Sequence, residues 1–340
     1  MAEVDVIILN WNGLAFLKEY LPVLIKHTRT SLADITVADN GSSDGSVEWI
    51  RSNYPDRVRT ISFEKNFGFA GGYNRALEQS GARFSVLLNS DVEVTENWLE
   101  PMLELFKDES VAAVMPKIRN LRKRGHFEYA GAAGGFIDRW GFPFCRGRIL
   151  DNIEEDRGQY DNESEIFWAT GACMMIRNES FLQAGGFDDH FFAHMEEIDL
   201  CWRLKSGGQK IIFTPASTVY HLGGGTLPSG NERKVFLNVR NSLFTLYKNL
   251  PRKNMLSIVF MRMILDGLAA FRFLFGGEPR SFRAVLKAHM EFYSGRKRYR
   301  DKRKSHPNLL HPRSMTGYYG GSIIVGYYMG KKTFSSLDHR

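Results

Sequence analysis

Acidic and amide side chains follow several apolar runs of this sequence, at the points where those runs end. The stretch LLNSDVEV (87–94) passes from apolar residues to Asn89-Ser90-Asp91, and an earlier run, DITVADN (34–40), ends in Asp39 and Asn40. A carboxylate at the end of a strand can accept hydrogen bonds from a hydroxyl or an imide N–H, the donors of a ribose and a nucleobase. These positions raise the question of what needs a carboxylate where a buried strand surfaces.

A glycine-rich segment, EKNFGFAGGYNRA (64–76), follows another apolar run. Glycine lets the backbone approach a ligand closely, and a helix starting near Gly72 would aim free N–H groups at negative charge. Both features also have an ordinary structural explanation. The segment DNGSSDGS (39–46) is a good turn and helix cap, and the glycine cluster is a good strand-to-helix turn. On the residues alone the two interpretations stay open.

Three acids lie close together in FFAHMEEIDLCWRL (191–204). If a helix starts near Met195, then Glu196, Glu197 and Asp199 fall in its first turn, where carboxylates interact favourably with the helix dipole. That is a sufficient structural reason for acids there. We expect Asp199 to pair with Arg203, which follows it at i+4.

These residues need elements that bring them together. Apolar runs bounded by Gly, Asn, Asp or Pro predict strands at 4–11, 34–40, 58–63 and 84–89. Apolar positions at helical spacing predict helices between them, at 14–27, 46–54 and 71–81. Strands that are apolar on both faces and alternate with helices indicate a parallel sheet covered on both sides, and ligands bind outside the carboxyl ends of such strands. The polar strand ends should therefore share one crevice.

Composition excludes several classes of protein. The chain has 340 residues and is 43% hydrophobic, which is enough for real cores in one large or two ordinary domains. Cys145, Cys173 and Cys201 form no C-x-x-C pattern, so we expect neither a disulfide framework nor a zinc site. The N-terminal MAEVDVIILNWNG indicates a strand and a turn, so we do not expect a secretion signal.

Charge is distributed unevenly along the chain. From Thr226 onward 22 Lys and Arg face 6 Asp and Glu, a net charge of +16, whereas the residues before it carry −9. The segment MLSIVFMRMILDGLAAFRFLF (255–275) is long enough to cross a bilayer, but Arg262, Asp266 and Arg272 disfavour spanning.

We expect an interfacial amphipathic helix there, followed by a polybasic run, SGRKRYRDKRK (294–304), that is attracted to an anionic surface. The alternative is a helical cap packed on the rest of the protein, with a solvated basic face. No nucleic-acid-binding motif is recognised, so nucleic acid is not expected as a partner.

Six motifs occur in an order that resembles the inverting family 2 glycosyltransferases, particularly their rhamnosyltransferase-like bacterial branch. They are VIILNWNG (6–13), VADNGSSDGS (37–46), KNFGFAGGYNRAL (65–77), LLNSDVEV (87–94), the segment from WATGAC to LKSGG (168–208) and VYHLGGGT (219–226). The resemblance covers roughly residues 4–245. It implies an α/β fold of the GT-A (Rossmann-like) type, with a mostly parallel mixed sheet flanked by helices, and a nucleotide-sugar donor.

The resemblance also implies an organisation of the chain. A GT-A catalytic domain would occupy 1–245, with a nucleotide-binding half at 1–95 and an acceptor-side half at 96–245. Residues 246–340 would form an amphipathic, basic, membrane-associating helical extension.

The family's metal-binding D-x-D maps onto Asn89-Ser90-Asp91, so this chain keeps the last acid and has Asn in place of the first. That departure is common in the rhamnosyltransferase-like branch, and metal affinity should fall accordingly. The resemblance implies Asp91 and His221 as ligands of a divalent cation, Mn²⁺ or Mg²⁺, and an imidazole ligand slightly favours manganese. The alternatives are that Asp91 only caps a helix and that His221 is hydrogen-bonded in the core.

The family has an acid pair whose second member is the general base, which maps onto Glu197, with Glu196 as the other candidate. Trp168, Gly171 and Asp188 lie in the segment that resembles the acceptor side, and Trp168 could equally fill the core. The residues expected to contact the nucleotide sugar are Asn10, Trp11, Asp39, Asn66, Gly71, Asn74, Asn89 and Asp91.

The resemblance therefore implies a metal-dependent inverting hexosyltransferase that moves one sugar from a nucleotide-diphosphate sugar to a saccharide or polyprenyl-diphosphate-linked acceptor, a glycolipid or polysaccharide precursor. Such an enzyme would be cytoplasmic and peripherally attached to the anionic inner face of the cell membrane. The missing first acid keeps open a non-catalytic sugar-nucleotide-binding or membrane scaffold protein. A sugar nucleotidylyltransferase is the other alternative, although its Gly-rich, basic N-terminal phosphate loop is absent.

Overall fold

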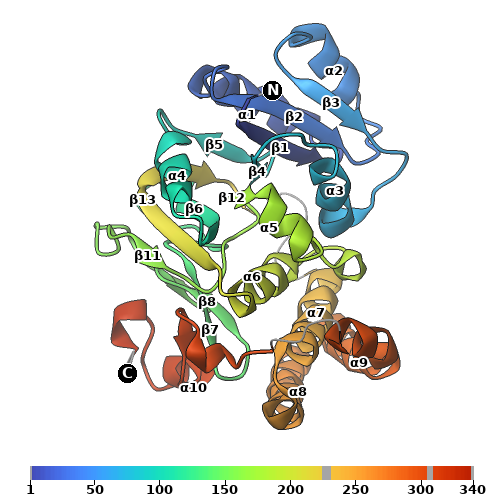
Figure 1. The fold of residues 1–340 in the computed structure, drawn as a ribbon. Coiled ribbons are helices and arrows are strands. Elements are labelled where there is room, and N and C mark those ends of the chain that lie inside the picture. The colour runs from blue at the N-terminus through green and yellow to red at the C-terminus, as the bar shows by residue number, and fades with distance from the viewer. Residues whose placement is uncertain (1, 224–230, 305–308, 338–340) are drawn as a thin grey trace.

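The computed structural model describes residues 2–223, 231–304 and 309–337. In this part of the chain a nine-stranded mixed sheet is flanked by helices, a smaller five-stranded sheet lies beside it, and three long C-terminal helices pack together (Figure 1). The expected α/β fold, with a mostly parallel mixed sheet and a helical C-terminal region, is confirmed.

The strands of the large sheet are β1 (Val4–Asn10), β2 (Ala33–Asp39), β3 (Arg59–Ser62), β4 (Phe84–Leu88), β5 (Val92–Val94), β6 (Val111–Asn120), β11 (Ser164–Glu165), β12 (Cys173–Arg177) and β13 (Lys210–His221). Those of the small sheet are β7 (Gly135–Asp138), β8 (Pro143–Cys145), β9 (Arg148–Ile149), β10 (Asn152–Ile153) and β14 (Tyr318–Tyr319). The helices are α1 (Leu14–His27), α2 (Ser46–Asn53), α3 (Gly68–Leu77), α4 (Glu100–Glu104), α5 (Asn178–Gln183), α6 (Glu196–Ser206), α7 (Glu232–Asn249), α8 (Arg252–Phe275), α9 (Pro279–Lys304) and α10 (Ile323–Tyr328).

The N-terminal part of the large sheet is parallel, in the order β3-β2-β1-β4. Each of the four strands lies within a residue or two of its expected range, because each is a short β-branched run closed by turn residues. All four therefore point their carboxyl ends to one edge, as expected. Beyond β4 the sheet becomes mixed, since β12 pairs antiparallel with both β4 and β6.

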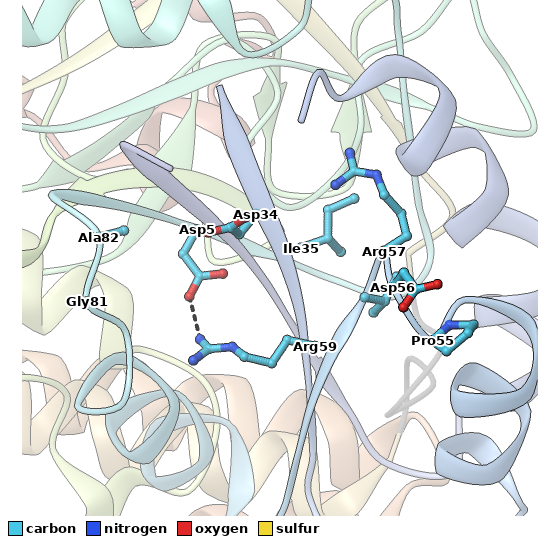
Figure 2. A pocket seen from close by; sticks show the side chains of 10 residues that line it. Asp5, Asp34, Ile35, Pro55, Asp56, Arg57, Arg59, Gly81 and Ala82 are labelled. Carbon is cyan, nitrogen blue, oxygen red and sulfur yellow. Dashed lines mark hydrogen bonds and ion pairs between the residues drawn. The ribbon is translucent and has the colours of Figure 1, made fainter. Parts of the chain in front are cut away.

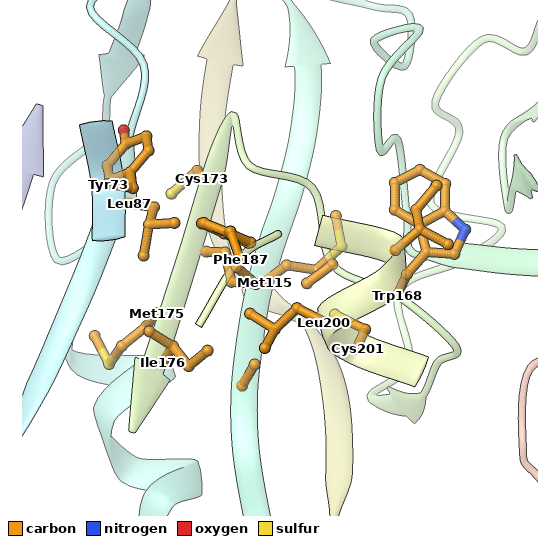
Figure 3. Packing of buried hydrophobic residues seen from close by; sticks show 14 of the residues in the cluster. Tyr73, Leu87, Met115, Trp168, Cys173, Met175, Ile176, Phe187, Leu200 and Cys201 are labelled. Carbon is orange, nitrogen blue, oxygen red and sulfur yellow. The ribbon is translucent and has the colours of Figure 1, made fainter. Parts of the chain in front are cut away.

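The main core lies between the centre of this sheet and the helices that cover it. Figure 3 shows buried side chains of β4, β6, β12 and α6 packed together, among them Leu87, Met115, Ile176 and Leu200. The three cysteines are buried and free, so the expectation of no disulfide holds.

Helices α7 and α9 are joined to the loop before α6, and α7 also to α6 itself, through ion pairs with buried carboxylates. The ammonium of Lys248 on α7 lies 2.8 Å from Asp188 and 2.9 Å from Asp199, and Lys302 on α9 lies 3.0 Å from Asp188. Both carboxylates are almost inaccessible to solvent. The domain boundary expected at residue 245 falls inside α7 and stays a prediction.

We expect the substitution Lys248→Met to lower the free energy of unfolding by about 3 kcal/mol, because it leaves two buried carboxylates without their shared cation. Urea unfolding monitored by fluorescence measures this. The control Lys107→Met, at an exposed ion pair, should change it by less than about 0.5 kcal/mol. Equal effects of the two substitutions would mean that the C-terminal helices are not held by this contact.

Candidate active site

The ends of β1 and β2 form a bonded polar corner. Asn10 lies opposite Asp39 in the parallel register, and its amide donates to the Asp39 carboxylate at 3.0 Å. The other Asp39 oxygen accepts from the backbone N–H of Ser42 at 2.9 Å. The side-chain oxygen Oδ1 of Asn10 is buried and accepts no hydrogen bond from any described residue, whereas Trp11 next to it is 48% exposed. The corner thus has a bonded carboxylate, an orphaned acceptor and an exposed ring.

The backbone N–H groups at the start of α3 donate hydrogen bonds to acceptors within the protein. The helix begins at Gly68, earlier than the expected start near Gly72. The backbone N–H groups of Phe67 and Gly68 donate to the side chains of Asn40 and Asn66. Those of residues 69 and 70 donate to the Phe192 carbonyl. The free N–H groups expected near this helix start are therefore not found, and the expected ligand contacts of Asn66 and Gly71 stay predictions.

A glycine is required where the loop before α6 meets this helix start. Gly68 has a φ of +75°, and a Cβ there would lie 2.5 Å from the Phe192 carbonyl oxygen. Further along α3, Asn74 bonds both the N–H and the carbonyl of Phe187, at 2.8 and 2.9 Å. These contacts hold the loop at residues 187–195 on the side of the sheet where β1 to β4 end.

Asp91 and His221 are brought together by strand pairing. β5 runs antiparallel to β13 and places His221 opposite Val92, directly after Asp91. The His221 Nε2 then lies 3.2 Å from the Asp91 carboxylate and 3.4 Å from the Asn89 amide nitrogen. Both Asp91 and His221 are buried, so their interaction is little screened by solvent.

A third group in this cluster, Glu128, was not recognised in the sequence. Its carboxylate is buried and lies 3.5 Å from Nδ1 of His221, on the other side of the ring from Asp91. Burial opposes the charged imidazolium, but the carboxylates of Glu128 and Asp91 outweigh it and raise the pKa of His221 to about 10. Burial likewise opposes the charged form of Asp91, yet the hydrogen bond and charge of His221 lower the pKa of its carboxyl.

The donor set at this cluster fits a divalent cation held with few protein ligands. No group of three or more His, Cys, Asp or Glu side chains in residues 2–223, 231–304 and 309–337 is arranged to hold a metal. Asp91 and the Nε2 of His221 are close enough for one cation to contact both, and binding of the cation would displace the proton from Nε2. Glu128 on Nδ1 would orient the imidazole, as carboxylates do for metal-binding histidines.

Strained backbone precedes the acid pair. Phe192, His194 and Met195 all have positive φ, at 64°, 70° and 72°, in the left-handed region that costs energy for residues other than glycine. Asn241 on α7 donates to three carbonyls of this segment, those of Phe191, Ala193 and His194. Asn241 is a second contributor that the sequence pattern did not reveal, because its partners are some fifty residues away.

The two acids that follow differ in exposure. Glu196 is buried and Glu197 is partly accessible, and one oxygen of each accepts no hydrogen bond from the described residues. Burial raises the pKa of Glu197 to about 7. Burial, followed by the charge of Glu197, raises the pKa of Glu196 well above its usual value. Asp199 differs, since it pairs with Arg203 at 3.0 Å, which confirms that expected contact.

The residues expected on the acceptor side are built into the fold. The indole N–H of Trp168 donates to the Phe136 carbonyl at 2.8 Å, and its ring lies among the buried side chains of Figure 3. Asp188 is held by Lys248 and Lys302. A Cβ at Gly171 would lie 2.6 Å from the ring of Phe69. Contact of these three residues with an acceptor stays a prediction.

A separate cavity of about 420 Å³ lies at the opposite edge of the sheet (Figure 2). It is lined by residues at the starts of β1, β2 and β3, including Asp5, Asp34 and Arg59, with Arg59 paired to Asp5 at 2.8 Å. Because it is at the amino ends of these strands, it lies away from Asp39 and Asp91 at their carboxyl ends.

With this geometry in view, comparisons with known proteins define the class. The chain has the fold of GT-A glycosyltransferases. It aligns with S. aureus TarS (residues 1–349) at a TM-score of 0.54 and 13% identity, over 97% of this chain and 92% of that one. It aligns with the mannosyltransferase PcManGT from Pyrobaculum calidifontis, solved with GDP-Man and Mn²⁺, at 0.53 and 14%, over 90% and 84%. At these identities the likeness shows the fold alone.

The family is shown by the sequence. The model of glycosyl transferase family 2 matches residues 5–183, so the chain belongs to that family. It is 25% identical over 211 residues to the N-acetylglucosaminyl-diphospho-decaprenol L-rhamnosyltransferase of Mycobacterium tuberculosis, covering 55% of this chain and 66% of that protein. It is 25% identical over 207 residues to the O-antigen biosynthesis protein RfbC of Myxococcus xanthus, covering 60% and 16%. The resemblance to the rhamnosyltransferase-like bacterial branch is thus confirmed.

The raised pKa of Glu197 predicts a stability that depends on pH. Between its ordinary pKa of 4.5 and about 7, the folded protein holds a proton that the unfolded chain has released. The contribution of Glu197 to the free energy of unfolding therefore falls as the pH rises through this window. Glutamine does not titrate, so the Tm of Glu197→Gln should rise relative to that of the wild type from about pH 4.5 to about pH 7.

Thermal unfolding of both proteins across this range tests the prediction. The exposed Glu109 provides the control, because Glu109→Gln should leave Tm nearly unchanged. Parallel Tm curves for the wild type and Glu197→Gln would show that Glu197 is not desolvated in the folded protein.

Proposed function

We propose that this protein is a metal-dependent inverting glycosyltransferase that moves one sugar from a nucleotide-sugar donor to a saccharide or polyprenyl-diphosphate-linked acceptor. The observation that carries the proposal is Glu197, a partly accessible carboxylate with a raised pKa and an unpartnered oxygen, at the start of a helix that follows strained backbone. Family membership supports the reaction class.

Glu197 acts as the general base. Direct displacement at the anomeric carbon requires removal of the proton of the acceptor hydroxyl as the new bond forms, and a base with a pKa near 7 is well matched to that task. Deprotonated Glu197 accepts this proton on its carboxylate. Glu196, buried beside it, keeps the local charge of the pair low, because its own raised pKa favours the neutral acid.

The donor binds at the carboxyl ends of β1 to β4. Asp39 and Asn10 contact the nucleoside, Trp11 covers it, and the side chains of Asn66 and Asn74 with the backbone at Gly71 line the path to the sugar. Asn89, Asp91 and His221 lie where the donor diphosphate would end. A cation held by Asp91 and His221, Mn²⁺ or Mg²⁺, would neutralise the charge of the departing diphosphate. Two structures of similar fold, one solved with UDP and Mn²⁺ and the other with GDP-Man and Mn²⁺, support a divalent cation at this site.

The acceptor class is supported by the relatives. One is named for rhamnosyl transfer to an N-acetylglucosaminyl-diphospho-decaprenol and another for O-antigen biosynthesis. Trp168, Gly171 and Asp188 shape the wall on the acceptor side from within the fold. The proposed location is the cytoplasm, with peripheral attachment to the inner face of the cell membrane.

Substitution of Glu197 distinguishes a glycosyltransferase from a non-catalytic sugar-nucleotide-binding protein. We expect Glu197→Gln to lower kcat by about 10²–10⁴-fold while the Kd of the donor stays unchanged, because only proton removal is lost. Release of nucleotide diphosphate measures kcat, and calorimetry with Mn²⁺ present measures Kd. The kcat of the wild type should fall as the pH drops below about 7. Equal turnover of both proteins would exclude Glu197 as the base.

The metal assignment is tested by a matched pair of substitutions two residues apart. Asp91→Ala should weaken Mn²⁺-stimulated donor binding about tenfold or more, because it removes the carboxylate ligand. Glu93→Ala should not, since both Glu93 oxygens accept from Arg124 at 2.8 Å. Electron paramagnetic resonance of Mn²⁺ gives the metal affinity independently of turnover. Unchanged Mn²⁺ affinity in Asp91→Ala would overturn the assignment.

A further inference from the structure

Helix α8 presents a stripe of large apolar side chains to solvent. Leu256, Phe260 and Leu268 are 72%, 65% and 62% exposed, and Phe275 is 86% exposed. The α8 stripe comprises Leu256, Phe260, Ile264, Leu268, Phe271, Leu274 and Phe275. The spacings of three and four residues place these side chains on one face along the length of the helix.

Two charged residues in the middle of the same helix face inward. Arg262 and Asp266 are each only 4% exposed and pair with each other at 2.9 Å. The Arg262 guanidinium also donates to the Gly141 carbonyl at 2.9 Å and lies 3.8 Å from the centre of the Phe142 ring. Helix α8 thus buries an ion pair together with apolar side chains such as Ile258 and Val259, and it exposes a second set of apolar side chains to solvent.

Helix α8 packs on the protein through Ile258, Val259 and Ala270, and it still leaves the α8 stripe exposed. No helix in residues 2–223, 231–304 or 309–337 has both the length and the apolar character needed to span a bilayer. Contiguous apolar surface on a protein marks a surface that binds something apolar.

The neighbouring helix α9 supplies the charge. It packs along α8, with the Tyr293 hydroxyl 3.6 Å from the Met263 sulfur. Its outward face mixes the exposed apolar residues Leu286, Met290 and Tyr293 with exposed cations. These cations are Arg283, Lys287, Arg296, Lys297 and Arg300.

Acids contribute little to this face. Asp266 on α8 is buried with Arg262, Glu291 on α9 is paired with Arg240, and the exposed Asp301 of α9 is outnumbered by the exposed cations of that helix. A face that is apolar and cationic together complements an anionic lipid surface, where acyl chains and phosphate headgroups lie within a few ångströms of each other.

We propose that the outer face of α8 and α9 docks on an anionic membrane, with the α8 stripe inserted at the level of the acyl chains and the α9 cations among the headgroups. This inference rests on the proposed function, since an acceptor linked to a polyprenyl diphosphate lies in such a membrane. Arg262 and Asp266 stay buried against the body of the protein, so the helix lies in the interface.

Flotation of the full chain with lipid vesicles tests this docking. The wild type should bind phosphatidylcholine vesicles that contain about one third phosphatidylglycerol, and bind pure phosphatidylcholine vesicles more weakly. The double variant Phe260→Ser/Leu268→Ser should bind the anionic vesicles at least about tenfold more weakly. Its matched control, Leu182→Ser/Leu310→Ser, removes two exposed apolar side chains outside the stripe and should bind like the wild type.

A second pair of variants tests the charge. Lys297→Glu/Arg300→Glu should lose binding to anionic vesicles, whereas Lys18→Glu/Lys26→Glu, which changes the net charge equally on α1, should keep it. Absence of wild-type binding to anionic vesicles would overturn the proposal. A second result would also overturn it: the wild type sediments as a dimer, Phe260→Ser/Leu268→Ser sediments as a monomer, and the two bind vesicles equally. The α8 stripe would then be covered by a second copy of the chain.

The inactive variant Glu197→Gln keeps the two proposals distinguishable. It should bind vesicles like the wild type, because Glu197 lies outside the docking face. If the wild type transfers sugar to a soluble acceptor but does not bind vesicles, only the docking proposal is overturned. If the wild type binds vesicles but has no transferase activity, only the proposed function is overturned.

Discussion

The contact between helix α7 and the loop at residues 187–195 is the constraint on which the acid pair depends. Lys248 pairs with Asp188 in this loop and with Asp199 in helix α6 after it, and Asn241 bonds three of the loop's carbonyls. Left-handed backbone at three non-glycine residues persists only where the surroundings over-determine it. The C-terminal helices therefore supply the framework that holds Glu197 in place, although they lie outside the segment matched by the family model.

Elements with local signals could be predicted from the sequence. The first four strands and α1 lie within a residue or two of their expected bounds. The signals that predict them, apolar periodicity and flanking turn residues, lie in the same residues that form each element. The pairing of Asp199 with Arg203 is also local, one helical turn apart. Asp91 and His221 could be expected together only through the family resemblance. The register of β5 on β13 that joins them spans more than a hundred residues, and no periodicity reveals it.

Contributions that depend on tertiary contacts could not be predicted. Glu128 reaches His221 from a loop between β6 and β7, and nothing in its neighbouring residues distinguishes it from a surface acid. Arg262 and Asp266 read as interruptions of an apolar helix, and hydropathy alone assigns such charges to the solvent side. Their burial depends on the Gly141 carbonyl and the Phe142 ring, which the fold brings to α8 from the second sheet region. The polarity of a helix is thus a property of its neighbours as well as of its own sequence.

The acid pair and the exposed stripe both reduce the stability of the isolated protein. Glu196 and Glu197 keep unpartnered oxygens with raised pKa values, and the stripe leaves apolar surface in water. The same helical unit accommodates both, because α7 holds the loop before Glu197 and packs against α9, which packs along α8. No long linker separates the outer face of α8 and α9 from the loop at residues 187–195. Binding of the α8 stripe to a membrane would therefore fix the orientation of Glu197 relative to the lipid surface, through packed helices and buried ion pairs.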